Sequence, residues 1–215
     1  MFDRLAARLA DPAPVMICKS CPHPRRPRDE SLHEVAVVHI AGPPADAASL
    51  ALLKRSLRGH ADDLLSLWAR WNGLALYAEP SPQPSNFLVA LYPPQEMEPA
   101  TQAMRPWLAM GERRAAAYPD LAVLRDAIVI GGPAMAANAL VVLGGERAGT
   151  IAVFDHETLS AEPIASDATE LAELLASDPI ALARRLGGTC RYRFDDRSMD
   201  QLYPVEYRPD ARAVN

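Results

Sequence analysis

Apolar residues recur at helical spacing in two adjacent stretches of the chain. Residues 45–61 carry leucines three and four positions apart, so we expect a helix there with one apolar face. Residues 62–71 repeat the pattern with leucines and tryptophans, and Asn72-Gly73 supplies the left-handed residue that ends this second helix. The apolar positions are Leu50, Leu53 and Leu57 in the first predicted helix and Leu64, Leu67, Trp68 and Trp71 in the second.

Short apolar runs, several of them rich in β-branched residues, predict strands in the middle of the chain. Residues 74–77 and 87–91 flank a proline-rich loop, and we expect them to pair as a hairpin with a long loop. Three further runs, residues 127–130, 139–143 and 150–154, are separated by glycines where turns are required. Such short links favour antiparallel pairing, so these runs predict a meander.

The stretch between the two groups of strands, residues 96–117, is prone to form helix but contains Pro106 and Gly111. Because proline is tolerated in the first turn of a helix and disrupts its interior, we expect one short helix and a second that begins near Pro106. Trp107 is then an apolar anchor of the second helix.

Helix signals return towards the C-terminus. Asp167 and Glu170 have the spacing of a capping box in front of an amphipathic helix, and Asp178-Pro179 begins another helix. We expect a short strand over residues 191–194, followed by a polar tail.

Proline shapes the N-terminal part of the sequence. It recurs between residues 12 and 44 and removes backbone donors, so we expect this leader to be extended or loop, apart from one strand over residues 34–40 at an edge of the main sheet. Along the whole chain, predicted strands and helices segregate instead of alternating, which is typical of an α+β fold. The prediction is a single domain with a mainly antiparallel sheet flanked by helices over residues 45–215, including a C-terminal tail, and an irregular N-terminal segment over residues 1–44.

Composition and charge narrow the function classes. A chain of 215 residues with 49% hydrophobic and 23% charged residues is ordinary for a globular domain. Its formal net charge of −5 argues against a nucleic-acid binder and suits a basic partner better than an anionic one. The first residues lack the apolar core of a signal peptide and no stretch is long enough to span a bilayer, so we expect a cytoplasmic protein without membrane association.

The sequence also holds half of the spacing of a zinc site. Cys18 and Cys21 are followed by His23, and thiolates with imidazole are a proper ligand set for zinc. The other half is missing, because Cys190 and the remaining histidines lie far away without paired spacing. We therefore expect ordinary thiols, no bound metal, no cofactor and, in a reducing compartment, no structural disulfide.

Four sequence segments follow one another in the order seen in a known family. Residues 63–73 form a predicted helix ending in Asn-Gly, residues 139–143 a strand, residues 149–157 a strand that begins with glycine and runs into Asp-His, and residues 167–175 a helix. Their order resembles domains of the SUKH superfamily, which includes fungal cell-wall-assembly regulators and bacterial toxin-immunity proteins, and the resemblance covers residues 45–187. It implies an α+β binding scaffold without shared catalytic residues, used in bacteria to neutralise diverse toxins.

The polar triplet Asp155-His156-Glu157 follows the predicted strand over residues 150–154 and has two interpretations. It forms an acid/base group if it lines a cleft beside a nucleophile, since histidine side chains titrate near neutrality. Otherwise it is the polar exit of a strand into a loop, which is the interpretation we favour.

We therefore expect a non-enzymatic protein-binding domain, similar to SUKH immunity proteins, that neutralises a toxin or regulates a partner by direct binding. Contacts belong to polar loop residues on a rigid sheet, and Glu79, Asp155 and His156 are the candidates for partner binding. Two alternatives stay open: a hydrolase that uses Asp155 and His156, and an accessory scaffold protein of a secretion or envelope assembly that docks through its leader. The sequence carries no signal for the oligomeric state.

Overall fold

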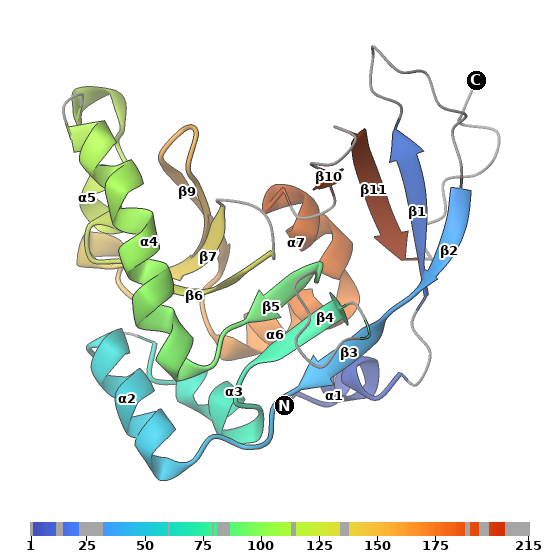
Figure 1. Cartoon of the computed structure of the whole chain (residues 1–215). Coiled ribbons are helices and arrows are strands. Elements are labelled where there is room, and N and C mark those ends of the chain that lie inside the picture. Colours follow the sequence, from blue (N-terminus) through green and yellow to red (C-terminus); the bar gives the residue numbers. More distant parts are fainter. Residues whose placement is uncertain are drawn as a thin grey trace.

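The chain forms an α+β fold with two antiparallel sheets, shown in the computed structural model (Figure 1). The larger sheet has seven strands, in the spatial order β3 (Val38–Ala41), β4 (Leu74–Ala78), β5 (Val89–Leu91), β6 (Ile128–Gly132), β7 (Ala139–Val142), β8 (Ile151–Asp155) and β9 (Ser160–Ala165). The smaller sheet has four, in the order β10 (Cys190–Arg193), β11 (Ser198–Pro204), β1 (Val15–Cys21) and β2 (Leu32–Ala36). The structure describes residues 2–11, 15–21, 32–59, 61–78, 80, 87–112, 115–133, 138–187, 190–193 and 198–204.

Helices flank the larger sheet, which confirms the predicted α+β class with a mainly antiparallel sheet. The helices of the described residues are α1 (Asp3–Leu9), α2 (Ala47–Leu57), α3 (Leu64–Arg70), α4 (Pro94–Glu112), α5 (Leu121–Leu124), α6 (Ala168–Ser177) and α7 (Pro179–Arg185), with short 3-10 turns η1 (Ala115–Ala117) and η2 (Gly145–Arg147). None of these helices combines the length and the apolar character needed to cross a membrane.

Both faces of the five inner strands of the larger sheet, β4 to β8, are largely buried, whereas the edge strands β3 and β9 are partly exposed. Along β7, Leu140 and Val142 enter the core on one face, with α3, α6 and α7, whereas Val141 enters the core on the other face, with α4 and α5. Figure 1 shows α4 on one side of the sheet and α6 and α7 on the other. Successive side chains of a strand point to opposite faces, so a strand that is covered on both sides needs apolar residues at every position. This is why the run over residues 139–143 is continuously apolar.

Helix α4 is a single helix, so the predicted division near Pro106 is wrong. Its buried face consists of Met97, Thr101, Met104 and Leu108, spaced three and four residues apart. Pro99 and Pro106 lie on the exposed side of the helix, where the carbonyl groups that lose a partner can bond to water. Burial of one whole face against the sheet therefore outweighs two missing backbone hydrogen bonds.

Thr101 ties α4 to the sheet. Its hydroxyl donates a hydrogen bond to the Met97 carbonyl oxygen at 2.7 Å and accepts one from the Val129 amide of β6 at 2.9 Å. Thr101 is 1% exposed, and the pairing of β6 with β7 shifts its register directly after Val129. A buried amide without a partner costs about 1–3 kcal/mol. The Thr101 hydroxyl supplies that partner at an irregular point of the sheet.

The N-terminal segment is more structured than the sequence predicts. The single strand expected over residues 34–40 divides at Val37: β2 pairs with β1 in the smaller sheet, and β3 pairs with β4 at the edge of the larger sheet, where we expect it. The expected polar tail contains β11, which pairs with β1 across nearly the whole length of the chain. Strand propensity depends on such distant neighbours, so no local pattern indicates this pairing.

Helix ends follow the sequence closely. Beyond α3, Gly73 adopts a left-handed φ of 84°, as predicted, and Arg58 after α2 adopts one of 53° without a prediction. At the start of α6, the Asp167 carboxylate accepts a hydrogen bond from the Glu170 amide at 2.8 Å, which confirms the first half of the predicted capping box. The Glu170 carboxylate accepts the Ser166 amide at 2.7 Å in place of the Asp167 amide.

Two adjacent glycines of β6 give a matched test of the close approach between β6 and β5. A Cβ on Gly131 would lie 2.1 Å from the Ala90 carbonyl oxygen, whereas the atoms nearest to a Cβ on Gly132 are 3.4 Å away. We expect Gly131→Ala to lower the free energy of unfolding by about 1–3 kcal/mol, because backbone must move. Gly132→Ala should change it by less than about 0.5 kcal/mol. Urea denaturation followed by tryptophan fluorescence measures both, and equal effects would contradict the close approach of Gly131 to the Ala90 carbonyl group.

Tyr92 should make the fold sensitive to alkali. Burial, and then the nearby Glu96 carboxylate, raise the pKa of the Tyr92 phenol above its ordinary value of 10.0. The unfolded chain therefore loses this proton at a lower pH than the folded chain, so stability is lost as pH rises above about 10. Denaturation midpoints measured between pH 9 and 11.5 should fall less steeply in Tyr92→Phe than in the wild type. Parallel curves would show that Tyr92 does not contribute.

Candidate functional site

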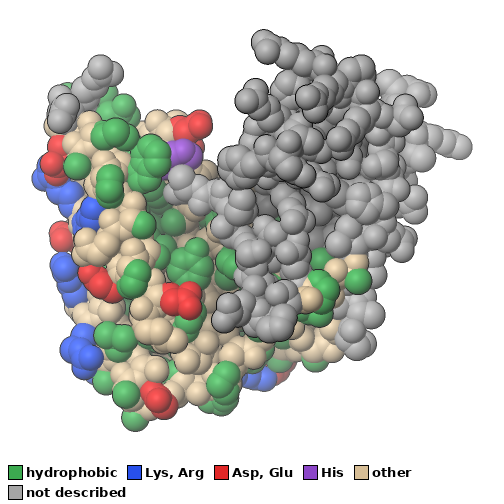
Figure 2. All heavy atoms as spheres, viewed as in Figure 1, with side chains coloured by type: hydrophobic (Ala, Val, Ile, Leu, Met, Phe, Trp, Pro, Cys, Tyr) green, Lys and Arg blue, Asp and Glu red, His purple; other side chains and the backbone are tan. Residues whose placement is uncertain are grey.

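An open pocket of about 820 Å³ lies between the C-terminal part of α4 and the turn that joins β8 to β9. We name it the His156 pocket; its described lining residues are Trp107, Met110, Gly111, Tyr118, His156, Glu157 and Leu159. Figure 2 shows hydrophobic, acidic and histidine side chains close together at the upper end of this face of the molecule. A hollow of this volume suits a large side chain or a small ligand.

The apolar part of the lining reaches the surface at Met110. This side chain is 60% exposed and is the one large hydrophobic side chain that is mainly exposed among those whose burial the structure describes. Trp107 lies one helical turn before it on α4, and Trp107 and Tyr118 are each only partly buried against the core beneath the pocket. Apolar side chains that are exposed together in this way are typical of a binding surface.

Leu159 forms one wall of the pocket by packing onto α4. It adopts a left-handed φ of 50°, yet its side chain is buried. A Cβ on Gly111 would lie 2.3 Å from the Leu159 Cδ1 atom, so the leucine occupies the space that the glycine leaves open. The last turn of α4 and the β8–β9 turn therefore fit together directly.

Asp155 shapes the β8–β9 turn. One of its carboxylate oxygens accepts hydrogen bonds from the amides of Glu157 at 2.8 Å and Thr158 at 3.3 Å. This is an Asx turn, in which a side chain replaces a backbone acceptor. Asp155 is not among the described residues that line the pocket. Asp155, although predicted to contact a partner, therefore supports the pocket and does not form its surface.

His156 lines the pocket, as its prediction as a contact residue requires, and two neighbours hold its ring. The Asn138 Oδ1 atom lies 2.7 Å from the His156 Nδ1 atom and also accepts the His156 backbone amide at 3.1 Å. The Trp107 ring meets the imidazole edge to face, with centroids 4.9 Å apart. A hydrolase using Asp155 and His156 needs the carboxylate to orient the imidazole, but the Asp155 hydrogen bonds go to its own turn and the His156 Nδ1 bond goes to Asn138.

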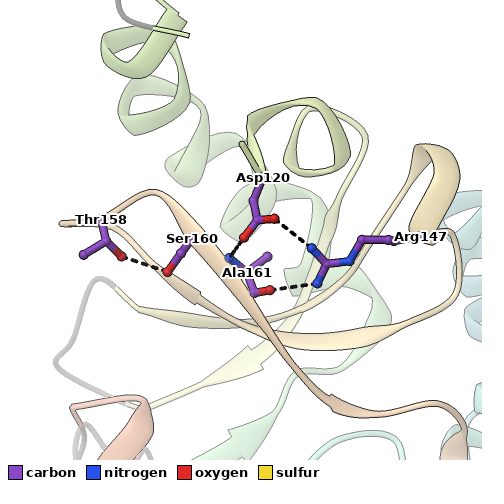
Figure 3. Close-up of polar contacts among 5 residues, drawn as sticks. All are labelled: Asp120, Arg147, Thr158, Ser160 and Ala161. Carbon is purple, nitrogen blue, oxygen red and sulfur yellow. Dashed lines mark hydrogen bonds and ion pairs between the residues drawn. The ribbon is translucent and has the colours of Figure 1, made fainter. Parts of the chain in front are cut away.

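A second polar cluster fixes the edge strand β9 (Figure 3). Asp120 forms an ion pair with Arg147 at 2.8 Å and accepts a hydrogen bond from the Ala161 amide at 2.8 Å. Arg147 donates to the Ala161 carbonyl oxygen at 2.8 Å. Both backbone groups of Ala161 therefore point away from β8, and the charged pair takes the place of a neighbouring strand.

The same edge is closed further along β9. Pro163 lies two residues after Ala161, on the same side of the strand, and has no N–H group to offer. Beside the charged pair, the Thr158 and Ser160 hydroxyls bond to each other at 2.8 Å. An edge that is blocked in this way resists pairing with a foreign strand, so the Asp120–Arg147 cluster serves the fold.

Several residues singled out in the sequence are not described by the structure. Glu79 and His23 are not among the described residues, and the side chains of Cys18, Cys21 and Cys190 are not described. Within the part of the chain that the structure describes, no group of three or more His, Cys, Asp or Glu side chains is placed to hold a metal ion.

No protein-family model, curated protein or solved structure matches the chain. The evidence for the candidate site therefore comes from its own residues and contacts.

Most of the pocket was not predicted from the sequence. His156 was predicted, and Trp107 was identified only as an apolar anchor. Met110 and Tyr118 carry no signal of their own, because each is a single apolar or aromatic residue without a motif around it. The one available hint is the spacing of Trp107 and Met110, which stand three residues apart beside the buried face of α4.

The contact between Gly111 and Leu159 can be tested by a double-mutant cycle. Gly111→Ala should lower the free energy of unfolding by about 1–2 kcal/mol, because the new methyl group displaces the leucine. In a Leu159→Ala background the same substitution should cost nothing, since the space is free and alanine favours helix. Chemical denaturation of the four proteins measures the coupling. Additive effects would show that the two residues do not touch.

Proposed function

We propose that this protein is a non-enzymatic binding protein that recognises a partner protein through the His156 pocket. The resemblance to the SUKH superfamily supports a role in which direct binding neutralises a toxin or regulates the partner. The pocket's position on two rigid elements, a long helix and a tight turn between strands, suits recognition that needs little reordering on binding.

The exposed Met110 side chain is the observation that carries this proposal. The other large apolar side chains whose burial the structure describes are at least partly covered, and Met110 stands at the mouth of a pocket with two aromatic residues, Trp107 and Tyr118. Binding hot spots are typically central, apolar or aromatic and ringed by polar groups. Glu157 supplies an exposed acidic group at this rim.

The polar residues around the pocket support binding over hydrolysis. Asp155 and Asn138 direct their side-chain acceptors at backbone amides and at His156, where they hold a turn and a ring in place. A hydrolytic site needs an activated nucleophile or a bound metal beside such a histidine. The described residues lining the pocket include no serine, threonine, cysteine or lysine.

The proposal predicts that one charge at the pocket mouth abolishes partner binding. Tagged wild-type protein and a Met110→Asp variant are used to capture proteins from the native host, and bound proteins are identified by mass spectrometry. We expect at least about a tenfold loss of the stoichiometric partner in Met110→Asp, because burying an unpaired carboxylate in an apolar contact is costly.

The matched control is Ala51→Asp, which adds the same charge to an exposed position of α2. Helix α2 contacts α4, and Figure 1 shows it beside the end of α4 that is remote from α5. Ala51→Asp should capture the partner as the wild type does. Equal capture by all three proteins would place the interface elsewhere, and capture of no stoichiometric partner by the wild type would contradict the proposed function.

A further inference from the structure

The two nitrogens of the His156 imidazole differ in their partners: Nδ1 is bonded to Asn138, and Nε2 has no partner among the described residues. The Asn138 side-chain atom that accepts the His156 backbone amide must be an oxygen, and the same oxygen lies 2.7 Å from Nδ1. Nδ1 of the neutral ring therefore carries the hydrogen, and Nε2 carries a lone pair. Within the described residues Nε2 has no hydrogen-bond partner, whereas the ring itself lines the pocket.

The pocket thus offers a hydrogen-bond acceptor beside aromatic walls. Trp107 meets the His156 ring edge to face, and Tyr118 and Leu159 contribute further apolar surface. An aromatic guest that fills this space can donate to Nε2 from its own polar tip. A guest ring without a donor would bury the Nε2 lone pair unsatisfied, which is unfavourable.

Glu157 adds a charge preference at the same place. Its side chain lines the pocket, is exposed and forms no ion pair with any described residue. The formal net charge of the whole chain, −5, has the same sign. A basic residue next to the aromatic guest meets complementary charge.

We propose that the His156 pocket receives from its protein partner an aromatic side chain that carries a hydrogen-bond donor, such as tyrosine, next to an arginine or lysine. The donor bonds to His156 Nε2, the ring lies among Trp107, Met110 and Tyr118, and the basic group faces Glu157. This specificity rests on the proposed binding function and adds the chemistry of the bound segment.

Capped tetrapeptides test the proposal on the full chain. The peptides Gly-Arg-Tyr-Gly, Gly-Arg-Phe-Gly and Gly-Glu-Tyr-Gly are titrated up to millimolar concentrations against ¹⁵N-labelled protein. The Trp107 indole N–H signal, assigned with a Trp107→Phe variant, reports occupancy. We expect the Arg-Tyr peptide to bind about tenfold more tightly than the Arg-Phe peptide, and more tightly than the Glu-Tyr peptide.

Two variants assign these preferences to their residues. In His156→Phe the advantage of tyrosine over phenylalanine should vanish, and in Glu157→Gln the advantage of arginine over glutamate should shrink. Because His156→Phe also removes the bond to Asn138 and can disturb the turn, the ¹⁵N shift of His156 Nε2 in the wild type gives a second readout. It should move on addition of the Arg-Tyr peptide and stay unchanged with the Arg-Phe peptide.

The outcomes separate this proposal from the broader one. Equal affinities for tyrosine and phenylalanine in the wild type, a tyrosine preference that survives in His156→Phe, or no shift of Trp107 with any peptide would each overturn it. If partner capture still depends on Met110 in those cases, the pocket remains a protein-binding surface with a different guest. Loss of both the peptide preference and the dependence on Met110 would show that the His156 pocket is not the binding surface, and capture of no stoichiometric partner by the wild type would remove the binding function as well.

Discussion

The seven-stranded sheet buries apolar side chains on both of its faces, so helices have to cover it on both sides. That constraint decides the path of α4, which crosses one face as a continuous helix although it contains Pro99 and Pro106. Thr101 fixes the helix to β6 through a buried hydrogen bond. The position of the last turn of α4, and of every side chain on it, follows from this docking.

The candidate site lies at the end of that docked helix. Met104 and Leu108 belong to the buried face, whereas Trp107 and Met110 lie beside it, towards the turn between β8 and β9. Gly111 lets Leu159 of that turn pack onto the helix. The pocket is therefore a product of two elements that each serve the core, and its walls are as rigid as the sheet and helix that carry them.

Charged and polar groups near the pocket divide into two roles. One group forms hydrogen bonds to backbone groups: Asp155 to those of a turn, and Asp120 and Arg147 to those of an edge strand. His156 and Glu157 keep polar atoms towards the pocket or the surrounding solvent. Acidic and basic residues that suggest catalysis in a sequence thus serve largely to support the fold. The exceptions are His156, which offers a hydrogen-bond acceptor for recognition, and Glu157, which offers a negative charge.

The sequence by itself determined the local structure: the helical faces of α2 and α3, the left-handed Gly73 after α3, the cap of α6 and the strands of the meander. These local features depend on residues a few positions apart, so their spacing and backbone preferences can be read from the sequence. Tertiary structure alone decided that α4 is unbroken, that β1 pairs with β11, and that Trp107, Met110 and Tyr118 line one pocket with His156. Each of those outcomes depends on burial and hydrogen bonding between segments far apart in sequence, and those energies exist only once the fold brings the segments together.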